Sequence, residues 1–252
     1  MKTGFMLSCS VVAAFLAVIA AVPAAASTIT VAWRDKAPYH YIENGVEQGF
    51  LLKRARQIFD NAGVPAEFVQ EPAKRIWANF AAGAQSYCSI GWYRLPEREA
   101  MVQFSEAFHT DPPHTVLVAP NALAQVKAHR TLASLLKDKD LVLGVVDGVS
   151  YGPELDAMIK ASQNQIDRKT VTPALMTRSV AVSRVSYMFI DRADWEYFNE
   201  RDDNMRKTIQ LDLPDMPQGL NRYITCSKDV PRDVMQRLNK AIDAMNKSKK
   251  GA

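Results

Sequence analysis

The sequence predicts an α/β fold made of two blocks in which strands and helices alternate. In the first block, residues 29–91, the order is strand, helix, strand, helix, strand, which is typical of a parallel sheet covered by helices. The alternation restarts near residue 132 and continues to residue 211. A last amphipathic helix, beginning at Asp229-Val230-Pro231, has no strand after it. We expect this helix to return to the first block, so that the second block is an insertion in the first.

The elements of the first block follow from apolar spacing and from the residues that interrupt it. Apolar residues recur on one helical face over residues 49–63, and Gly63 ends that pattern. Short runs with β-branched residues, bounded by Pro or Gly, are typical of strands. We therefore expect strands over residues 29–33, 65–69 and 87–91, and a second helix over residues 72–83.

The second block shows the same two patterns. We expect helices over residues 132–136, 153–159, 173–184 and 193–198, and strands over residues 141–146, 187–190 and 207–211. Two further extended runs, Thr115–Ala119 and Arg222–Cys226, flank this block. Residues 212–219 contain two prolines and are predicted to form a loop.

The first 26 residues have the pattern of a secretory signal peptide. Lys2 gives a positive start, Val11–Val22 is apolar, and Ala24–Ala26 offers a small-residue cleavage site before Ser27. A membrane anchor is the alternative, but the apolar run is short for a span. We therefore expect residues 1–26 to be removed and the protein to be exported to the periplasm.

Composition and scattered histidines exclude several function classes. The formal charge of +4 over 252 residues comes with no basic stripe, so nucleic acid is not an expected partner. The chain has no Gly-rich phosphate loop and no nucleophile elbow, and we expect no cofactor. The histidines lack metal-ligand spacing, which predicts no metal site; they are His40, His109, His114 and His129.

Two cysteines remain after the predicted cleavage, Cys88 and Cys226, and both lie in apolar runs. An oxidising compartment permits a disulfide between them. Two buried thiols are the alternative, because the sequence does not give the Cα separation that decides the matter.

The stretch from Gly91 to Ser105 has the strongest chemical pattern. Its order predicts a strand, a loop and a short helix opened by Pro96. A helix start offers free N–H groups and a positive dipole end, and Arg98 adds a planar set of donors that matches a carboxylate. We interpret this stretch as a seat for a small anion. The alternative is a surface arginine paired with Glu97 or Glu99.

Together with segments elsewhere, this stretch resembles the bacterial extracellular solute-binding proteins of family 3. The matching segments are Ala37-Pro38-Tyr39, Gly49-Phe50, Pro96-Glu97-Arg98, Phe104-Ser105, Val145–Ser150 and Arg184–Asp191. The resemblance implies the type II periplasmic binding protein fold, with a ligand cleft between two lobes. Lobe 1 would comprise residues 27–116 and 226–252, and lobe 2 residues 117–225. The runs Thr115–Ala119 and Arg222–Cys226 would be the hinge strands.

The same resemblance implies roles for individual residues. Arg98 matches the arginine that binds the ligand carboxylate, and Asp191 matches the acid that binds the ligand ammonium. For Asp191 the alternative is an N-cap for the following helix. Ser150 falls where small hydroxyl groups line the anion site. Four aromatic residues are candidates for the cleft wall, with core packing as the alternative: Trp33, Tyr39, Trp92 and Tyr93.

We therefore predict a periplasmic solute-binding protein rather than an enzyme. It would capture a small polar ligand, an amino acid in the first place and otherwise an organic anion, and deliver it to an ABC transporter permease in the inner membrane. Closure of the two lobes would trap the ligand, and we expect the protein to act as a monomer. Two alternatives stay open: an exported dehydratase-like enzyme on the same scaffold, and a periplasmic sensing or accessory protein that binds a small organic acid.

Overall fold

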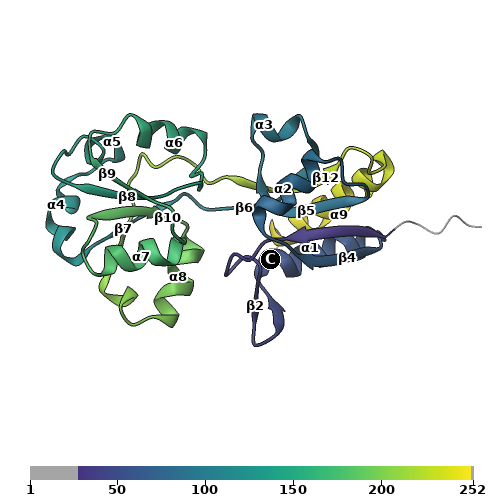
Figure 1. The fold of residues 1–252 in the computed structure, drawn as a ribbon, viewed down its shortest axis with the longest axis horizontal. Coiled ribbons are helices and arrows are strands. Elements are labelled where there is room, and N and C mark those ends of the chain that lie inside the picture. The colour runs from purple at the N-terminus through teal and green to yellow at the C-terminus, as the bar shows by residue number, and fades with distance from the viewer. Residues whose placement is uncertain (1–27, 251–252) are drawn as a thin grey trace, which may run out of the picture.

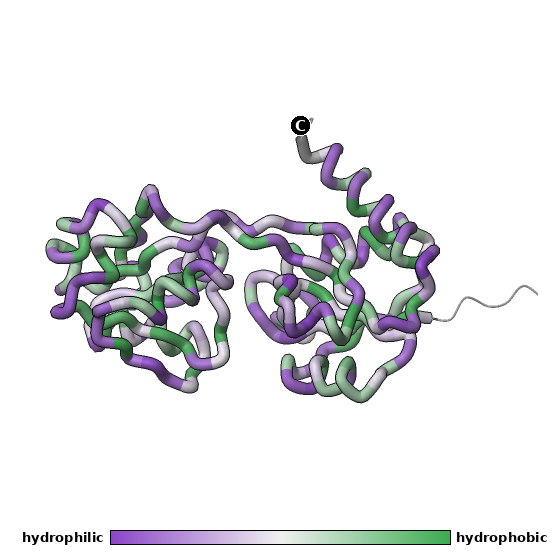
Figure 2. The backbone as a smooth tube through the Cα atoms, turned by 90° about the horizontal axis from the view of Figure 1, so that it is seen from above, coloured by the Kyte–Doolittle hydropathy of each residue, from purple (hydrophilic) through white to green (hydrophobic). Residues whose placement is uncertain are grey.

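The computed structural model describes residues 28–250, which form two lobes side by side (Figure 1). The predicted signal peptide, residues 1–26, lies outside the described residues. Each lobe contains one five-stranded sheet. The view from above shows the lobes joined by two chain segments (Figure 2). Among the described residues, no helix combines the length and apolarity needed to cross a membrane.

The sheet of lobe 1 has the strand order β4-β1-β5-β12-β6. Strands β1, β4 and β5 are parallel, as the sequence predicts, whereas β12 is antiparallel to β5 and to β6. The bounds are β1 Ile29–Trp33, β4 Ala66–Gln70, β5 Tyr87–Tyr93, β6 Val102–Thr110 and β12 Asn221–Ser227.

Helices cover both faces of this sheet. Alternating residues of a strand point to opposite faces, so Val31 and Trp33 pack under α1 and α9, while Ala32 packs with α2 on the other face. The long last helix returns to lobe 1, where it packs against β6 and α1 (Figure 1). The helix bounds are α1 Phe50–Asn61, α2 Ala73–Ala81, α3 Pro96–Glu99 and α9 Arg232–Lys250.

The sheet of lobe 2 has the order β11-β7-β10-β8-β9 and encloses its own apolar core. Its strands are β7 Thr115–Val118, β8 Val142–Val146, β9 Gln165–Lys169, β10 Tyr187–Ile190 and β11 Ile209–Leu211. Its helices are α4 Leu123–Ala128, α5 Leu132–Leu135, α6 Pro153–Lys160, α7 Pro173–Ala181 and α8 Arg192–Arg201. A separate hairpin, β2 Tyr41–Glu43 with β3 Val46–Gln48, extends from lobe 1.

The predicted hinges are wrong in detail. Thr115–Ala119 belongs largely to β7, inside the sheet of lobe 2, and Arg222–Cys226 belongs to β12, inside the sheet of lobe 1. The segments that cross between the sheets are residues 111–114 and 212–220. Both extended runs were recognisable from their composition, but sheet membership depends on partners that are distant in sequence.

A disulfide joins Cys88 of β5 to Cys226 of β12, so the structure resolves the alternative left open by the sequence. The two cysteines face each other across neighbouring antiparallel strands, with their Cα atoms 4.0 Å apart. The bond connects residues 138 positions apart in the chain, and lobe 2 lies between them. It therefore ties together the two ends of lobe 1 across the insertion.

Candidate functional site

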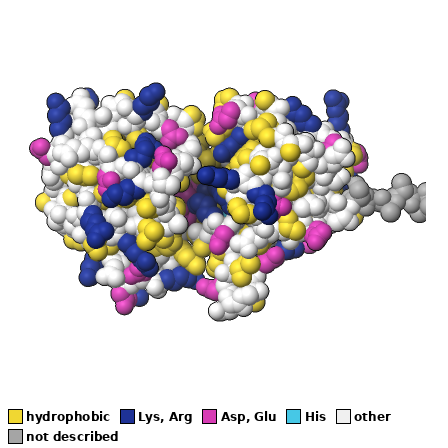
Figure 3. Space-filling view, viewed as in Figure 1, with side chains coloured by type: hydrophobic (Ala, Val, Ile, Leu, Met, Phe, Trp, Pro, Cys, Tyr) yellow, Lys and Arg dark blue, Asp and Glu magenta, His cyan; other side chains and the backbone are white. Residues whose placement is uncertain are grey.

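A cavity of about 220 Å³ lies between the lobes. Lobe 1 contributes Arg34, Trp92 and Arg98 to its lining, and lobe 2 contributes Ser150 and Asp191. The space-filling view shows this hollow at the junction of the lobes, with basic side chains inside it (Figure 3). Several lining residues follow the carboxyl ends of strands, where open α/β sheets commonly bind ligands.

One end of the cavity is cationic, and we call Arg34, Arg98 and Trp92 the open end. The guanidinium carbons of Arg34 and Arg98 lie 4.0 and 5.2 Å from the centre of the Trp92 ring. Arg98 donates to the Tyr93 carbonyl at 2.9 Å, and its guanidinium also lies 4.7 Å from the Trp77 ring. Among the described residues, neither arginine forms an ion pair with a carboxylate, and Arg34 Nη1 is buried without a hydrogen-bond partner.

The electrostatic environment of the open end is positive. Burial, followed by repulsion from Arg222, lowers the pKa of Arg34 to about 9. Burial also lowers the pKa of Arg98. The imidazole of His40 lies beneath Gly91, and its pKa is held well below the usual range by burial and by Arg34. A bound anion would relieve this repulsion, since opposite charge favours the charged form of each arginine.

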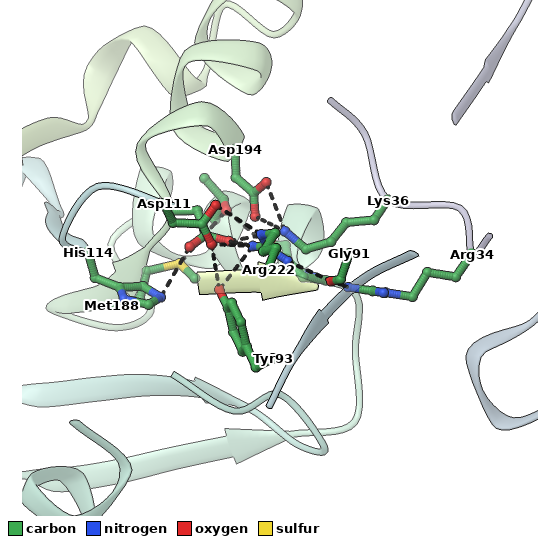
Figure 4. Close-up of polar contacts among 12 residues, drawn as sticks. Arg34, Lys36, Gly91, Tyr93, Asp111, His114, Met188, Asp194 and Arg222 are labelled. Carbon is green, nitrogen blue, oxygen red and sulfur yellow. Dashed lines mark hydrogen bonds and ion pairs between the residues drawn. The ribbon is translucent and has the colours of Figure 1, made fainter. Parts of the chain in front are cut away.

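The other end of the cavity is built around Arg222, which is 2% exposed (Figure 4). Its Nε donates to Asp111 Oδ1 at 2.9 Å, and its Nη2 lies 2.7 Å from Asp111 Oδ2. The guanidinium also donates to the Gly91 carbonyl at 3.1 Å and to the Tyr93 hydroxyl at 2.9 Å. The Tyr93 hydroxyl in turn donates to Asp111 at 2.8 Å. Each buried charge here has a charged partner, which is the condition under which burial is tolerated.

Lys36 extends this network across the lobes (Figure 4). It lies in the loop after β1, and its Nζ is 3.1 Å from Asp191 Oδ2 and 3.1 Å from both carboxylate oxygens of Asp194. Asp191 is also 3.5 Å from Arg222 and 3.2 Å from His114 Nε2. We call Lys36, Asp111, Asp191, Asp194 and Arg222 the paired end.

The two neighbouring carboxylates of α8 titrate in opposite directions. Burial alone would raise the pKa of Asp191, but Lys36, Arg222 and His114 outweigh it and hold that pKa well below the usual range. For Asp194, burial is the largest effect and raises the pKa despite the attraction of Lys36. Asp191 is therefore the stronger acid of the two.

The structure brings Arg98 and Asp191 to the same cavity from opposite lobes, as the sequence predicts for their positions. Neither alternative for these residues holds. The exposed Arg94, rather than Arg98, pairs with Glu99 at 2.6 Å. Asp191 precedes α8, but its side chain makes no capping hydrogen bond and instead faces Lys36. Their roles in ligand binding stay predictions.

The remaining predicted residues divide into two groups. Trp92, Tyr93 and Ser150 line the cavity, although the Ser150 hydroxyl already donates to Asp156 at 2.6 Å. Trp33 is fully buried under α1, and the prediction that it faces the cleft is wrong, because strand alternation directs it into the core.

Tyr39 is also misplaced by the prediction. It is 1% exposed and does not line the cavity. Its ring instead supports the paired end from behind, with Lys36 Nζ 4.0 Å and the Arg222 guanidinium 4.3 Å from its centre. Tyr39 therefore affects the site indirectly, through cation–π contacts with Lys36 and Arg222.

Sequence reasoning missed Arg34, Lys36, Asp194 and Arg222. Arg34 and Lys36 directly follow β1, so the rule that ligands lie at strand carboxyl ends could have found them. Arg222 has no local signal, because its partner Asp111 is 111 positions away. No group of three or more potential metal ligands occurs among residues 28–250.

Residues 29–251 match the family model of the bacterial extracellular solute-binding proteins, family 3. A comparison with curated proteins gave no match.

Similar solved structures cover most of the chain. The ancestral amino acid-binding protein AncCDT-1, a precursor of cyclohexadienyl dehydratase, has a TM-score of 0.65 and 19% identity over 88% of this chain and 90% of that chain. A periplasmic His/Glu/Gln/Arg/opine family-binding protein from Silicibacter pomeroyi, in complex with lysine, has a TM-score of 0.65 and 17% identity, over 88% of this chain and 93% of that chain. The amino acid ABC transporter substrate-binding protein AbpA from Streptococcus pneumoniae, bound to L-arginine, has a TM-score of 0.65 and 19% identity, over 88% of this chain and 90% of that chain. At identities of 17–19%, this similarity shows a common fold and does not extend to the ligand.

Proposed function

Because the chain belongs to the bacterial extracellular solute-binding proteins of family 3, we propose that it captures a small carboxylate ligand between its lobes for an ABC transporter. Amino acids are the ligands named for the similar structures, and the sequence also predicts one. The proposal includes export by residues 1–26, a periplasmic location and a monomeric protein.

The observation that carries the proposal is the open end. Two arginines that line an interlobe cavity share the ring of Trp92, and no described carboxylate neutralises them. Arginine presents donors in a planar arrangement that matches a carboxylate in two-point fashion. A cavity of about 220 Å³ suits a ligand of a few heavy atoms rather than a peptide or a sugar chain.

Lobe closure is the mechanism that this geometry supports. A ligand at the open end contacts lobe 1 through Arg34 and Arg98, and it can reach lobe 2 at the turn containing Ser150. A ligand that contacts both lobes favours the closed state by the free energy of those extra contacts. The two crossing segments, residues 111–114 and 212–220, are the places where the backbone would bend.

The test is binding of small acids to the purified protein that begins at Ser27. A thermal-shift screen with amino acids, organic acids, polyamines and sugars should show stabilisation by carboxylates only. Arg98→Ala should abolish that shift while the unliganded protein keeps its melting temperature. Arg94→Ala removes an exposed arginine of the same segment and should bind normally. Stabilisation by sugars or polyamines, or full binding by Arg98→Ala, would refute the proposed site.

An enzyme on this scaffold is the second candidate, favoured by one feature. Asp194 lines the cavity and burial raises its pKa, which is a property of general acids. However, both of its oxygens accept hydrogen bonds from Lys36, so neither is directed at a substrate. Incubation with cyclohexadienyl carboxylates, followed by ultraviolet absorbance, distinguishes the two functions, since a binding protein leaves the spectrum unchanged.

A further inference from the structure

The paired end of the cavity limits which class of carboxylate ligand can bind there. A zwitterionic ligand needs a carboxylate of the protein for its ammonium group, as well as an arginine for its own carboxylate. Among the described residues, the cavity lining contains two carboxylates, Asp191 and Asp194. Both already accept hydrogen bonds from the Lys36 ammonium at 3.1 Å.

Lys36 is held in place by the fold rather than by the ion pairs alone. Its backbone N–H donates to the His40 carbonyl at 2.8 Å, and its carbonyl accepts from Tyr39 at 2.9 Å and from His40 at 3.1 Å. Its ammonium rests on the Tyr39 ring, 4.0 Å from the centre. A tight turn and an aromatic surface therefore direct this cation at the lobe 2 carboxylates.

The local charge balance leaves little attraction for a second ammonium. Asp191 faces two cations, Lys36 and Arg222, and it also faces His114, whose pKa is lowered by burial. Its Oδ1 lacks a hydrogen-bond partner among the described residues, because His114 Nε2 lies at 3.2 Å without hydrogen-bond geometry. A neutral donor such as a hydroxyl could satisfy that oxygen, whereas an ammonium would meet repulsion from the cations beside it.

The whole lining is likewise cationic. Four of its side chains are arginine or lysine, against the two carboxylates. Arg222 pairs with Asp111, and Lys36 pairs with both Asp191 and Asp194, which leaves Arg34 and Arg98 without a carboxylate partner among the described residues. Burial raises the pKa of Asp194 to about 6, so mild acid weakens its negative charge first. The cavity thus offers two unpaired arginines to a negative charge, while both of its carboxylates already face the Lys36 ammonium.

We propose that Lys36 is a built-in counter-ion that occupies the ammonium position of the cleft, so that the protein selects small organic acids without an amino group over α-amino acids. This proposal rests on the proposed function and narrows its ligand class. Lys36 also links the lobes, because its partners lie at the start of α8 in lobe 2 while its own loop belongs to lobe 1. The cation that excludes an amino acid therefore also joins lobe 1 to lobe 2.

Calorimetry with matched acid pairs tests this selectivity. Each pair differs by the α-ammonium alone: glutarate and glutamate, succinate and aspartate, propionate and alanine, 3-phenylpropionate and phenylalanine. In the wild-type protein, the amine-free member of any pair that binds should bind at least about tenfold more tightly. Tighter binding of the amino acid, or equal binding, would overturn the proposal without any variant.

Variants at Lys36 test the cause of the selectivity. Lys36→Met keeps the contact with Tyr39 but removes the charge, and it should shift the preference toward the amino acid by about tenfold or more. Lys36→Gln is a second neutral variant in case the first does not fold. Lys53→Met, on the exposed face of α1, is the matched control and should keep the wild-type preference. A wild-type preference retained in a folded neutral Lys36 variant would refute the role of Lys36.

The outcomes separate this proposal from the broader function. If Arg98→Ala loses binding of both members of a pair, the carboxylate site stands whichever member the wild type prefers. If no acid of the panel binds the wild-type protein, both proposals fail. If amino acids bind best and Arg98→Ala abolishes their binding, only the role of Lys36 fails.

Discussion

Both ends of the interlobe cavity contain buried cationic side chains, but in the described part of the chain only those of the paired end have carboxylate partners. At the paired end, Arg222 and Lys36 are matched by Asp111 and by the carboxylates of α8, with distances of 2.7 to 3.5 Å for their ion pairs. At the open end, Arg34 and Arg98 rest on aromatic rings and have no carboxylate among the described residues.

The difference shows how a protein can divide stability and binding between neighbouring charges. A cation–π contact stabilises a buried cation by only about 0.5–2 kcal/mol, which compensates poorly for lost hydration. A buried ion pair with hydrogen bonds satisfies its groups internally and gives a ligand little to gain. We therefore expect substitutions at the paired end to affect folding, and substitutions at the open end to affect binding.

The largest expected effect is the loss of Arg222. Arg222→Met leaves Asp111 buried at 3% exposure without its cation, and breaking such a pair costs about 3–5 kcal/mol of unfolding free energy. Urea unfolding measures this loss. The control is Arg178→Met, which breaks the exposed pair with Asp202 and should cost less than about 1 kcal/mol. Equal losses in the two variants would show that the paired end does not support the fold.

Arg34 should give effects of opposite sign on stability and binding. Arg34→Met removes a buried N–H without a partner, which should raise the unfolding free energy by about 1 kcal/mol. The same change should weaken binding of an organic acid by about tenfold or more, because a charge-assisted contact is lost. Urea unfolding and calorimetry on one preparation provide both values. A loss of stability with unchanged affinity would contradict the assignment of Arg34 to the open end.

Lowering the pH should reduce the free energy of unfolding mainly through the carboxylates of the paired end. Burial raises the pKa of Asp111, but its hydrogen bond with His109 and its pairing with Arg222 lower it by more, so the net pKa lies below the usual range. A carboxylate with a lowered pKa adds stability above its unfolded pKa of about 3.9, and that stability is lost as the pH falls through the folded value. Asp111→Asn should therefore be less stable at neutral pH but show a shallower decline below about pH 4.

Urea unfolding at a series of pH values tests this prediction. Each unit of pKa difference corresponds to about 1.4 kcal/mol, which sets the size of the difference between the two curves. Parallel declines in the wild-type protein and in Asp111→Asn would mean that other carboxylates govern the acid limb.

The smallest effect is expected at Ser150, a predicted ligand residue. Its hydroxyl donates to Asp156 and accepts from the Gly152 N–H at 3.2 Å, so little of it is free for a ligand. Ser150→Ala should change affinity by less than about threefold, or roughly 0.65 kcal/mol. A larger loss in calorimetry would place the anion closer to lobe 2 than the two arginines indicate.

Local sequence patterns were sufficient for much of the site's framework. Arg98 follows a strand and a proline that opens a helix, and Asp191 follows an apolar strand, so both were marked as candidates; the resemblance to the solute-binding proteins then implied their place in a cleft. The same reasoning failed for Trp33, because a strand end says where a residue lies along the sheet but not which face it takes. It also missed the exposed edge strand β9, which has few buried residues to mark it.

The sequence by itself predicted most of the strands and helices, and it marked Arg98 at a helix start and Asp191 at a strand end. These features depend on spacing over a few residues, where apolar periodicity is directly visible. Only the tertiary structure decided which charges are neutralised. Lys36 and Asp191 are 155 positions apart, and Arg222 and Asp111 are 111 apart. The Coulomb energy of two charges depends on the distance between them and on their burial. The sequence shows neither quantity, so it does not tell whether a charged residue pairs with another residue or with a ligand.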